Sequence, residues 1–248
     1  MSAAALPATV VPVARAVTPT PVPTAAEALA VGGFEAFSTL DWPGRLAAVV
    51  FLQGCPWRCS YCHNPGLQPQ RPHRPALSWA DLRARWQARV GLLDGLVFSG
   101  GEPTLDPALP AALAEVRNTG LGTGLHTAGV SASRLSNLLP LLDWVALDIK
   151  AAPAHLEALT GAPGSVRETE RALQLVQRSG VAYELRTTWH PQWLPEPALL
   201  ELADWLAAHG VQRWVLQGGR PPGGGPTAVP NEALRQSLAV HVPHLSFR

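Results

Sequence analysis

Short apolar runs alternate with amphipathic segments over most of the chain. Six runs have the length and the content of β-branched and aromatic residues that strands favour. These runs cover residues 46–52, 95–99, 121–127, 144–149, 182–188 and 213–217. Helical patterns separate most of them, and this alternation predicts parallel βαβ units with right-handed crossovers. The pattern therefore predicts an α/β fold, either a barrel-like or a doubly wound sheet, and periodicity does not decide between the two.

Several of the intervening segments carry helix start or stop signals. Ser78, with Asp81 three residues later, forms a variant of the capping box, and Pro107 is suited to the first turn of the next helix. Residues 165–180 and 197–210 place apolar side chains on one face, and each ends at a glycine, which is common just beyond a helix. These signals predict helices between the strands.

Two segments depart from this pattern in composition. Residues 1–30 are rich in Ala, Pro, Thr and Val and carry only two charges, which predicts a disordered tail. Residues 218–230 are rich in Gly and Pro, which predicts a loop before a short closing helix. We therefore expect residues 31–248 to form a single domain.

Charge and hydropathy exclude several classes of protein. The chain has 19 basic and 18 acidic residues, a net charge of +1, and no basic stripe of the kind that binds nucleic acid. Its longest clean apolar run, residues 46–52, is far shorter than the roughly 20 residues of a membrane-spanning helix. The N-terminal segment lacks the early basic cluster of a signal peptide, and prolines interrupt it. We expect a cytoplasmic protein that binds neither nucleic acid nor membrane.

All three cysteines of the chain, Cys55, Cys59 and Cys62, lie within eight residues in the segment GCPWRCSYCHNPG. Such short spacings rarely allow an unstrained disulfide, so the thiols indicate a metal site in a reducing compartment. A zinc site that also uses His63 is one interpretation. However, His63 directly follows Cys62, and the chain has no second cysteine pair. Three thiolates without a fourth ligand suit a [4Fe–4S] cluster with one iron left open.

Polar or glycine residues follow the apolar runs, at the carboxyl ends of the expected strands, where α/β folds place their sites. They are Gly100, Gly101 and Glu102 after the second run, Thr127 after the third, Asp148 and Lys150 around the end of the fourth, Arg186 and His190 at the fifth, and Gln217 at the sixth. Taken singly, these residues have ordinary explanations. Asp148 and Lys150 could be an exposed pair at the end of a strand, and Arg186 could belong to a structural ion pair. His126 lies in an otherwise apolar run, which favours a packed side chain over a ligand of a metal or cofactor. Together the strand ends predict an active site assembled from several strands.

The segment CPWRCSYC, followed by GGEP after the next strand, resembles the signature of the radical S-adenosylmethionine (SAM) superfamily. Further segments, STLDWPGRLAAVVFLQGCPWRCSYCHNPGL, GLLDGLVFSGGEPTL, ALDIKA and YELRTTWHP, resemble the glycyl-radical-enzyme activases, and most closely the activating proteins of anaerobic ribonucleoside-triphosphate reductase. The resemblance extends from about Gly32 to Arg220. It implies a partial (β/α)6 barrel of the TIM type, in agreement with the six apolar runs.

The resemblance also implies roles for individual residues. Cys55, Cys59 and Cys62 would be the catalytic metal ligands and hold three irons, while SAM would chelate the fourth. The backbone around Tyr61 and His63 would contact the adenine side of SAM. The other implied SAM-binding residues are Gly100, Gly101 and Glu102 for the amino group, Thr127, Asp148, Lys150 and Arg186 for the carboxylate and ribose, and His190 near the adenine.

At two positions the chain departs from the family pattern. Relatives often have asparagine between the threonine and glycine that end the third strand, and this chain has Ala128. Relatives also tend to have an aromatic residue where this chain has Gly219. The first departure removes one side chain from the expected SAM site, and the second lies at the end of the barrel expected to face a partner.

The implied function is activation of a partner enzyme. Flavodoxin or ferredoxin would reduce the cluster, SAM would be cleaved to methionine and a 5′-deoxyadenosyl radical, and that radical would take a hydrogen atom from a glycine of the partner. The expected partner is anaerobic ribonucleoside-triphosphate reductase. Three alternatives stay open: activation of another glycyl radical enzyme such as pyruvate formate-lyase, radical SAM chemistry on a small molecule, and a zinc-stabilised binding module. With only three cysteines, a second Cys-ligated cluster is not expected.

Overall fold

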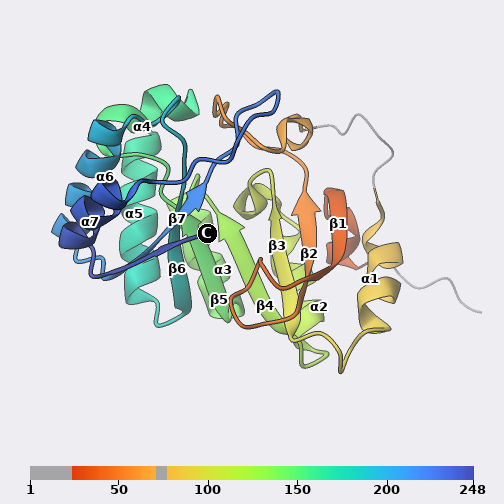
Figure 1. Ribbon diagram of the computed structural model, residues 1–248. Helices are drawn as coiled ribbons and strands as arrows, with labels where there is room; N and C mark the ends of the chain where they lie inside the picture. The colour runs from red at the N-terminus through yellow and green to blue at the C-terminus, as the bar shows by residue number, and fades with distance from the viewer. Residues whose placement is uncertain (1–23, 71–76) are drawn as a thin grey trace, which may run out of the picture.

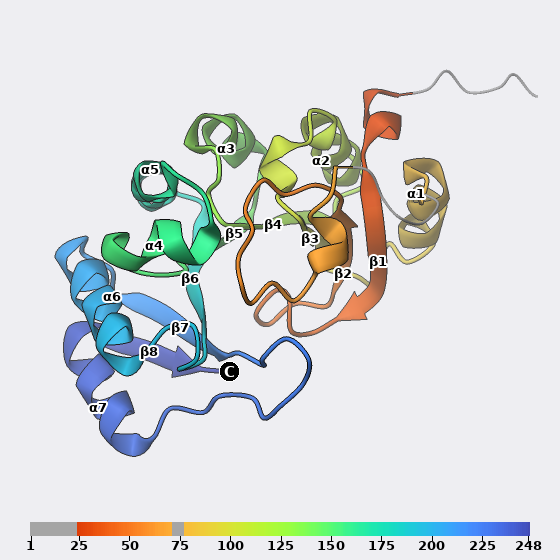
Figure 2. The ribbon, with the colours of Figure 1, turned by 90° about the horizontal axis from the view of Figure 1, so that it is seen from above.

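The centre of the fold is one eight-stranded sheet in which every strand lies beside its neighbours in sequence (Figure 1). The structure, a computed structural model, describes residues 24–70 and 77–248. The strands are β1 (Val31–Ser38), β2 (Ala47–Leu52), β3 (Gly95–Gly100), β4 (Gly122–Thr127), β5 (Trp144–Asp148), β6 (Ala182–Trp189), β7 (Arg213–Gly218) and β8 (His244–Phe247). β1 pairs antiparallel with β2, and all later pairs are parallel. The sheet curves, and among the described residues its edge strands β1 and β8 do not pair (Figure 2). It therefore forms a partial barrel, as the resemblance implies.

Helices cover the outer face of this sheet (Figure 2). They are α1 (Trp79–Gln87), α2 (Leu109–Arg117), α3 (Ala132–Leu138), α4 (Pro153–Thr160), α5 (Ser165–Arg178), α6 (Glu196–Ala208) and α7 (Glu232–His241), with the short 3-10 turns η1 (Ala25–Ala28), η2 (Pro65–Leu67), η3 (Pro103–Leu105) and η4 (Leu139–Leu141). Apolar side chains of the helices and of the outward face of the sheet form the main core. Over the described parts of the chain, no helix is long and apolar enough to cross a membrane.

The six strands expected from the apolar runs are all present, each within one residue or so of its expected bounds. The Ser78 hydroxyl accepts a hydrogen bond from the Asp81 amide at 3.0 Å, so the expected cap at the start of α1 is confirmed. Two strands have no counterpart among the expected ones. β1 contains the pair Gly32-Gly33 and has one fully buried residue among exposed and half-buried ones, and β8 has only four residues, so neither gives a continuous apolar run.

Part of the predicted tail belongs to the folded domain. Of residues 1–30, the last seven are described, and there Ala26 and Leu29 are buried in the main core. Glu27 forms an ion pair with Arg83 of α1. The boundary differs from the predicted one because alanine-rich sequence gives no strong signal for the 3-10 turn η1 that these residues form. Residues 1–23 lie outside the described residues.

The amino end of the barrel is filled by Trp42, from the loop between β1 and β2. Its ring stacks on that of Trp144, with the centroids 5.6 Å apart and the planes 15° apart. Glycines on the neighbouring strands leave the room for it. A Cβ atom on Gly95 would lie 2.8 Å from the Trp42 ring, and one on Gly122 would lie 3.0 Å from it. The interior is therefore closed at this end, and its free space lies at the carboxyl ends of the strands.

This packing predicts that Gly95→Ala lowers the stability of the protein. The added methyl group would meet the Trp42 ring and would also lie 2.6 Å from the Gly122 carbonyl oxygen, closer than any real Cβ contact. We expect the free energy of unfolding to fall by about 1–3 kcal/mol, the usual range for overpacking. Denaturant titration of the variant and of the control Gly66→Ala measures this, because a Cβ on Gly66 would meet nothing within 4 Å. Equal losses in the two variants would contradict the account of the Trp42 pocket.

Candidate active site

The cysteine loop folds over the carboxyl ends of β2 and β3. Cys55, Cys59 and Cys62 are free thiols, each half-buried, and all three line one cavity of about 180 Å³. Backbone contacts hold the loop against β3. The Glu102 amide donates to the Gly54 carbonyl at 2.8 Å, and a Cβ atom on Gly101 would lie 2.3 Å from the same oxygen. Glycine is required at position 101 because the two backbones approach so closely.

The arrangement of the thiols bears on the kind of metal site. Within the described residues, no three His, Cys, Asp or Glu side chains are placed to hold a single metal ion. His63 lines the same cavity but is exposed to solvent at the rim. All three thiols line the same cavity, and three thiolates around one space are the ligands that an iron–sulfur cluster uses.

Burial of the loop raises the pKa of the Cys55 thiol to about 11, and it also raises the pKa of Cys59. The nearby Lys150 ammonium acts in the opposite direction on both thiols. Metal ligation requires thiolates, so metal binding here releases protons, and the lysine favours the ligating form.

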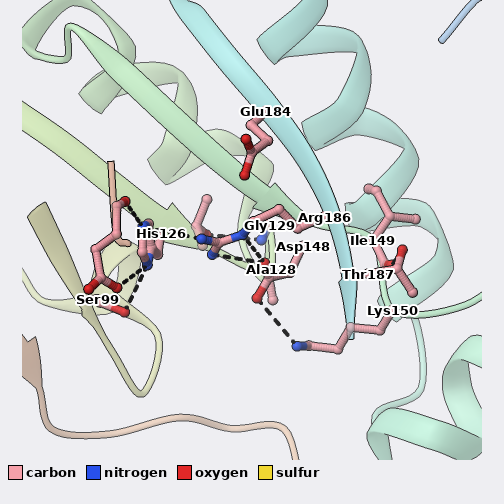
Figure 3. A network of polar contacts seen from close by, with 12 residues as sticks. Ser99, His126, Ala128, Gly129, Asp148, Ile149, Lys150, Glu184, Arg186 and Thr187 are labelled. Atoms are coloured by element: carbon pink, nitrogen blue, oxygen red, sulfur yellow. Dashed lines mark hydrogen bonds and ion pairs between the residues drawn. The ribbon is translucent and has the colours of Figure 1, made fainter. Parts of the chain in front are cut away.

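Beside the thiols, β5 and β6 deliver a compact charged group (Figure 3). Asp148 and Arg186 are register partners on these strands. Arg186 Nε donates to Asp148 Oδ1 at 3.0 Å, and Arg186 Nη2 forms an ion pair with the same oxygen at 3.0 Å. Lys150 Nζ lies 3.7 Å from Asp148 Oδ2. The pKa of Asp148 is lowered, because the two cations outweigh the effect of burial. Two cations share one carboxylate, so the group has one surplus positive charge next to the cavity.

Lys150 is the only lysine of the chain, against 18 arginines. Its ammonium lies 5.7 Å from the centroid of the Tyr61 ring, within range of a cation–π interaction. Burial alone would lower its pKa, but neighbouring groups (Tyr61, Asp148 and the cysteines) raise the net pKa above the ordinary value. The side chain therefore stays charged at neutral pH. A lysine ammonium binds an anion as a compact point charge, whereas an arginine guanidinium binds a carboxylate or phosphate through two parallel donors.

Both carboxylate oxygens of Glu102 accept hydrogen bonds from the protein. Its Oε1 accepts hydrogen bonds from the Thr104 amide and hydroxyl and from the Thr127 hydroxyl, and its Oε2 accepts from the Ala128 amide at 3.0 Å. The side chain is buried and does not line the cavity, whereas Gly100, Gly101 and Thr127 do. Burial raises the pKa of Glu102, against the effect of these donors. Because the residue at position 128 contributes only its backbone here, alanine in that position keeps the contact.

His126 is buried, as its apolar surroundings in sequence favour, but it also forms part of the cavity wall. Its Nε2–H donates to the Asp41 carbonyl at 2.7 Å, so Nδ1 accepts from the Ser99 hydroxyl at 3.3 Å. Burial, and secondarily the charge of Arg186, lowers the pKa of His126 to about 4. Ser99 and His126 were not among the expected site residues. The sequence could have indicated His126, because side chains two residues apart on a strand share a face. His126 therefore lies on the same inward face as position 128, two residues later.

His190 lies apart from the cavity wall. It stacks on Trp193, with ring centroids 4.8 Å apart. Trp193 in turn occupies the space beside Gly219, where a Cβ atom would lie 2.3 Å from its ring. An aromatic ring thus fills this place although position 219 is glycine, and the ring comes from the segment after β6.

The chain was compared with known proteins. The family model described as "Radical SAM superfamily" matches residues 49–188. A protein of Methanocaldococcus jannaschii named as a glycyl-radical enzyme activating enzyme is 27% identical over 180 residues, 70% of this chain and 73% of its own length. The pyruvate formate-lyase-activating enzyme of Clostridium pasteurianum is 33% identical over 125 residues, 48% of this chain, and the match spans only 52% of that enzyme.

Among solved structures, a radical SAM methyltransferase from Sphaerobacter thermophilus superposes with a TM-score of 0.63 at 18% identity, covering 84% of this chain and 67% of that one. At this level of identity the likeness concerns the fold. The comparisons confirm the superfamily that the cysteine spacing indicates, and with it the expected [4Fe–4S] cluster and SAM.

The buried His126 predicts a specific pH dependence of stability. The pKa is about 4 in the folded chain and about 6.5 in the unfolded chain, so the unfolded state binds the extra proton between these values. The free energy of unfolding should fall as the pH drops from 6.5 to 4, by about 3 kcal/mol from this group. His126→Gln keeps a donor toward Asp41 but does not titrate. The wild type should lose more stability than this variant across the window, as measured by denaturant titration, and parallel curves would contradict the assignment.

Proposed function

The chain belongs to the radical SAM superfamily, and on that basis we propose that it is a glycyl-radical-enzyme activase whose partner is anaerobic ribonucleoside-triphosphate reductase. The observation that carries the proposal is the cavity in which three free thiols face the charged group of Lys150, Asp148 and Arg186. Support for an activase comes from the names of the relatives, several of which are activating enzymes of glycyl radical enzymes.

The residues present fit the two cofactors. Cys55, Cys59 and Cys62 would hold three irons of the cluster, and the surplus positive charge beside the cavity suits the carboxylate of SAM. Gly100 and Gly101 line the cavity and would receive the amino group of SAM through their backbone. When bound, the reduced cluster and SAM supply a one-electron cleavage that gives methionine and a 5′-deoxyadenosyl radical, which takes a hydrogen atom from a glycine of the partner.

The protein's own residues position the cofactors and limit access of water. Lys150 and Arg186 provide cations on one side of the cavity, and Asp148 holds the guanidinium through one hydrogen bond and one ion pair to the same oxygen. Trp57 and Tyr61, both buried in the cysteine loop, cover the thiols with apolar surface. Exclusion of water matters because a reactive radical would otherwise be quenched.

The glycine of the partner would enter between β1 and β8, the two sheet edges that stand apart in Figure 2. The helices cover the other sides of the sheet. The reductase is the proposed partner because the segments quoted from the sequence resemble its activating proteins. Pyruvate formate-lyase is the second candidate partner, favoured by the 33% identity to its activating enzyme in Clostridium pasteurianum. Flavodoxin or ferredoxin is the proposed electron donor.

The test uses reconstituted protein, reductant, SAM and the anaerobic reductase from the same cell. We expect a glycyl radical on the reductase by electron paramagnetic resonance. Cys59→Ala should abolish both this signal and SAM cleavage, because a cluster ligand is lost. Ser60→Ala is the matched control, since Ser60 is the exposed neighbour of that ligand and should leave both unchanged.

The outcomes separate the candidates. A radical on pyruvate formate-lyase but not on the reductase would overturn the choice of partner. Rapid SAM cleavage with no radical on either enzyme would favour a small-molecule substrate. Normal SAM cleavage by Cys59→Ala would show that the ligands are wrongly assigned.

A further inference from the structure

Tyr61 lies between two of the cluster cysteines, and its ring stacks on that of Trp193. The two ring centroids are 4.8 Å apart and the planes 12° apart. The side chain is 4% exposed, and its hydroxyl makes no short hydrogen bond among the described residues, although the Lys150 ammonium is close enough to interact with it. Stacking on Trp193 therefore contributes to where the Tyr61 ring lies beside Lys150.

Trp193 connects three separate strand ends. It stacks on Tyr61 of the cysteine loop and on His190 at the end of β6, and its Nε1–H donates to the Thr188 carbonyl at 3.3 Å. The ring also fills the slot beside Gly219 at the end of β7. Its position is therefore fixed from several sides at once, and Tyr61 takes its own position from it.

The Tyr61 ring also contacts the charged group of the cavity. The Lys150 ammonium lies 5.7 Å from its centroid and 3.7 Å from Asp148 Oδ2. A lysine side chain has four rotatable bonds, so the ammonium is placed by what surrounds it. The aromatic ring and the carboxylate are the two neighbours that do so.

We propose that Trp193 is a positioning residue, which holds the Tyr61 ring in place and thereby fixes the Lys150 ammonium for the carboxylate of SAM. This inference rests on the SAM site of the proposed function and is independent of the partner. Trp193 itself does not line the cavity. Its effect passes through Tyr61 to the only lysine of the chain.

That lysine gives a direct readout in protein without SAM. Protein grown with ¹³C-lysine carries one labelled side chain, so a single Cε resonance reports Lys150. Trp193→Ala should shift or broaden this resonance, and Trp193→Phe, which keeps an aromatic ring, should largely preserve it. Trp205→Ala is the matched control, a half-buried tryptophan of α6 whose ring lies against His209 at a tilt of 38°. An unchanged resonance in Trp193→Ala would overturn the proposal.

Equilibrium binding of SAM to the reconstituted protein gives the second readout. Trp193→Ala should raise the dissociation constant about tenfold, the order expected for loss of a stacked aromatic pair. Iron and sulfide content should stay at the wild-type level. Weaker cluster incorporation with unchanged affinity per cluster would mean a structural role only, and would contradict a positioning role.

The slot beside Gly219 provides a rescue. Gly219 does not have a left-handed backbone, and once the tryptophan ring is gone the tightest remaining contact of a Cβ atom there is the Trp189 carbonyl oxygen at 3.0 Å, so a side chain fits if that carbonyl shifts by a few tenths of an ångström. Gly219→Phe alone should displace Trp193 and weaken SAM binding, whereas Trp193→Ala combined with Gly219→Phe should bind SAM more tightly than either single variant. Additive losses would overturn the proposal even if Trp193→Ala folds poorly. Failure of the wild type to activate a reductase, with these affinities as expected, would refute the partner alone.

Discussion

The close approach of the cysteine loop to the end of β3 is the constraint on which the site depends. The Gly54 carbonyl accepts the Glu102 amide at 2.8 Å, and a side chain at position 101 has no room there. This contact ties the loop that carries all three thiols to the edge of the sheet. The start of the loop is thereby fixed relative to the sheet whose strands β5 and β6 carry the charged side chains.

Glu102 extends the same constraint to β4. It joins Thr127 and the Ala128 amide to the turn after β3 and is itself buried, so its carboxylate acts as a fixed structural acceptor. Hydrogen bonds thus connect three backbone segments beside the cavity: the cysteine loop, the turn after β3 and the end of β4. Asp148 balances one of two nearby cations, which leaves a net positive charge facing the thiols. The protein supplies shape and charge, and the cofactors of the superfamily supply the reactive chemistry.

The sequence predicts much of this because the strands are continuous apolar runs with chemistry at their ends. The three cysteines, Gly101 and Lys150 could be found that way, since each lies in the segment that follows a strand. The edge strand β1 could not, because its glycines and exposed residues give no apolar run. His126 looked like an ordinary packed residue, since its partner, the Asp41 carbonyl, is 85 residues away.

The packing of Trp193 beside Gly219 also has no local signal. The two residues lie on different loops, and only the fold brings the ring of one into the space left by the other. In the sequence, Gly219 stands where relatives tend to have an aromatic residue. In the structure, the Trp193 ring occupies the space beside Gly219. Sequence patterns locate elements and strand ends, while contacts between distant loops decide how the side chains there are held.

We infer that the three thiols hold a cluster whose open iron is next to the cationic wall. Electron–nuclear double resonance on the reduced, reconstituted protein with isotope-labelled SAM would detect that arrangement. We expect a [4Fe–4S] signal coupled to ¹⁵N and ¹⁷O of the methionine amino and carboxylate groups. Tightly bound zinc without iron, or a cluster with no coupling to labelled SAM, would show that SAM does not bind the open iron of such a cluster.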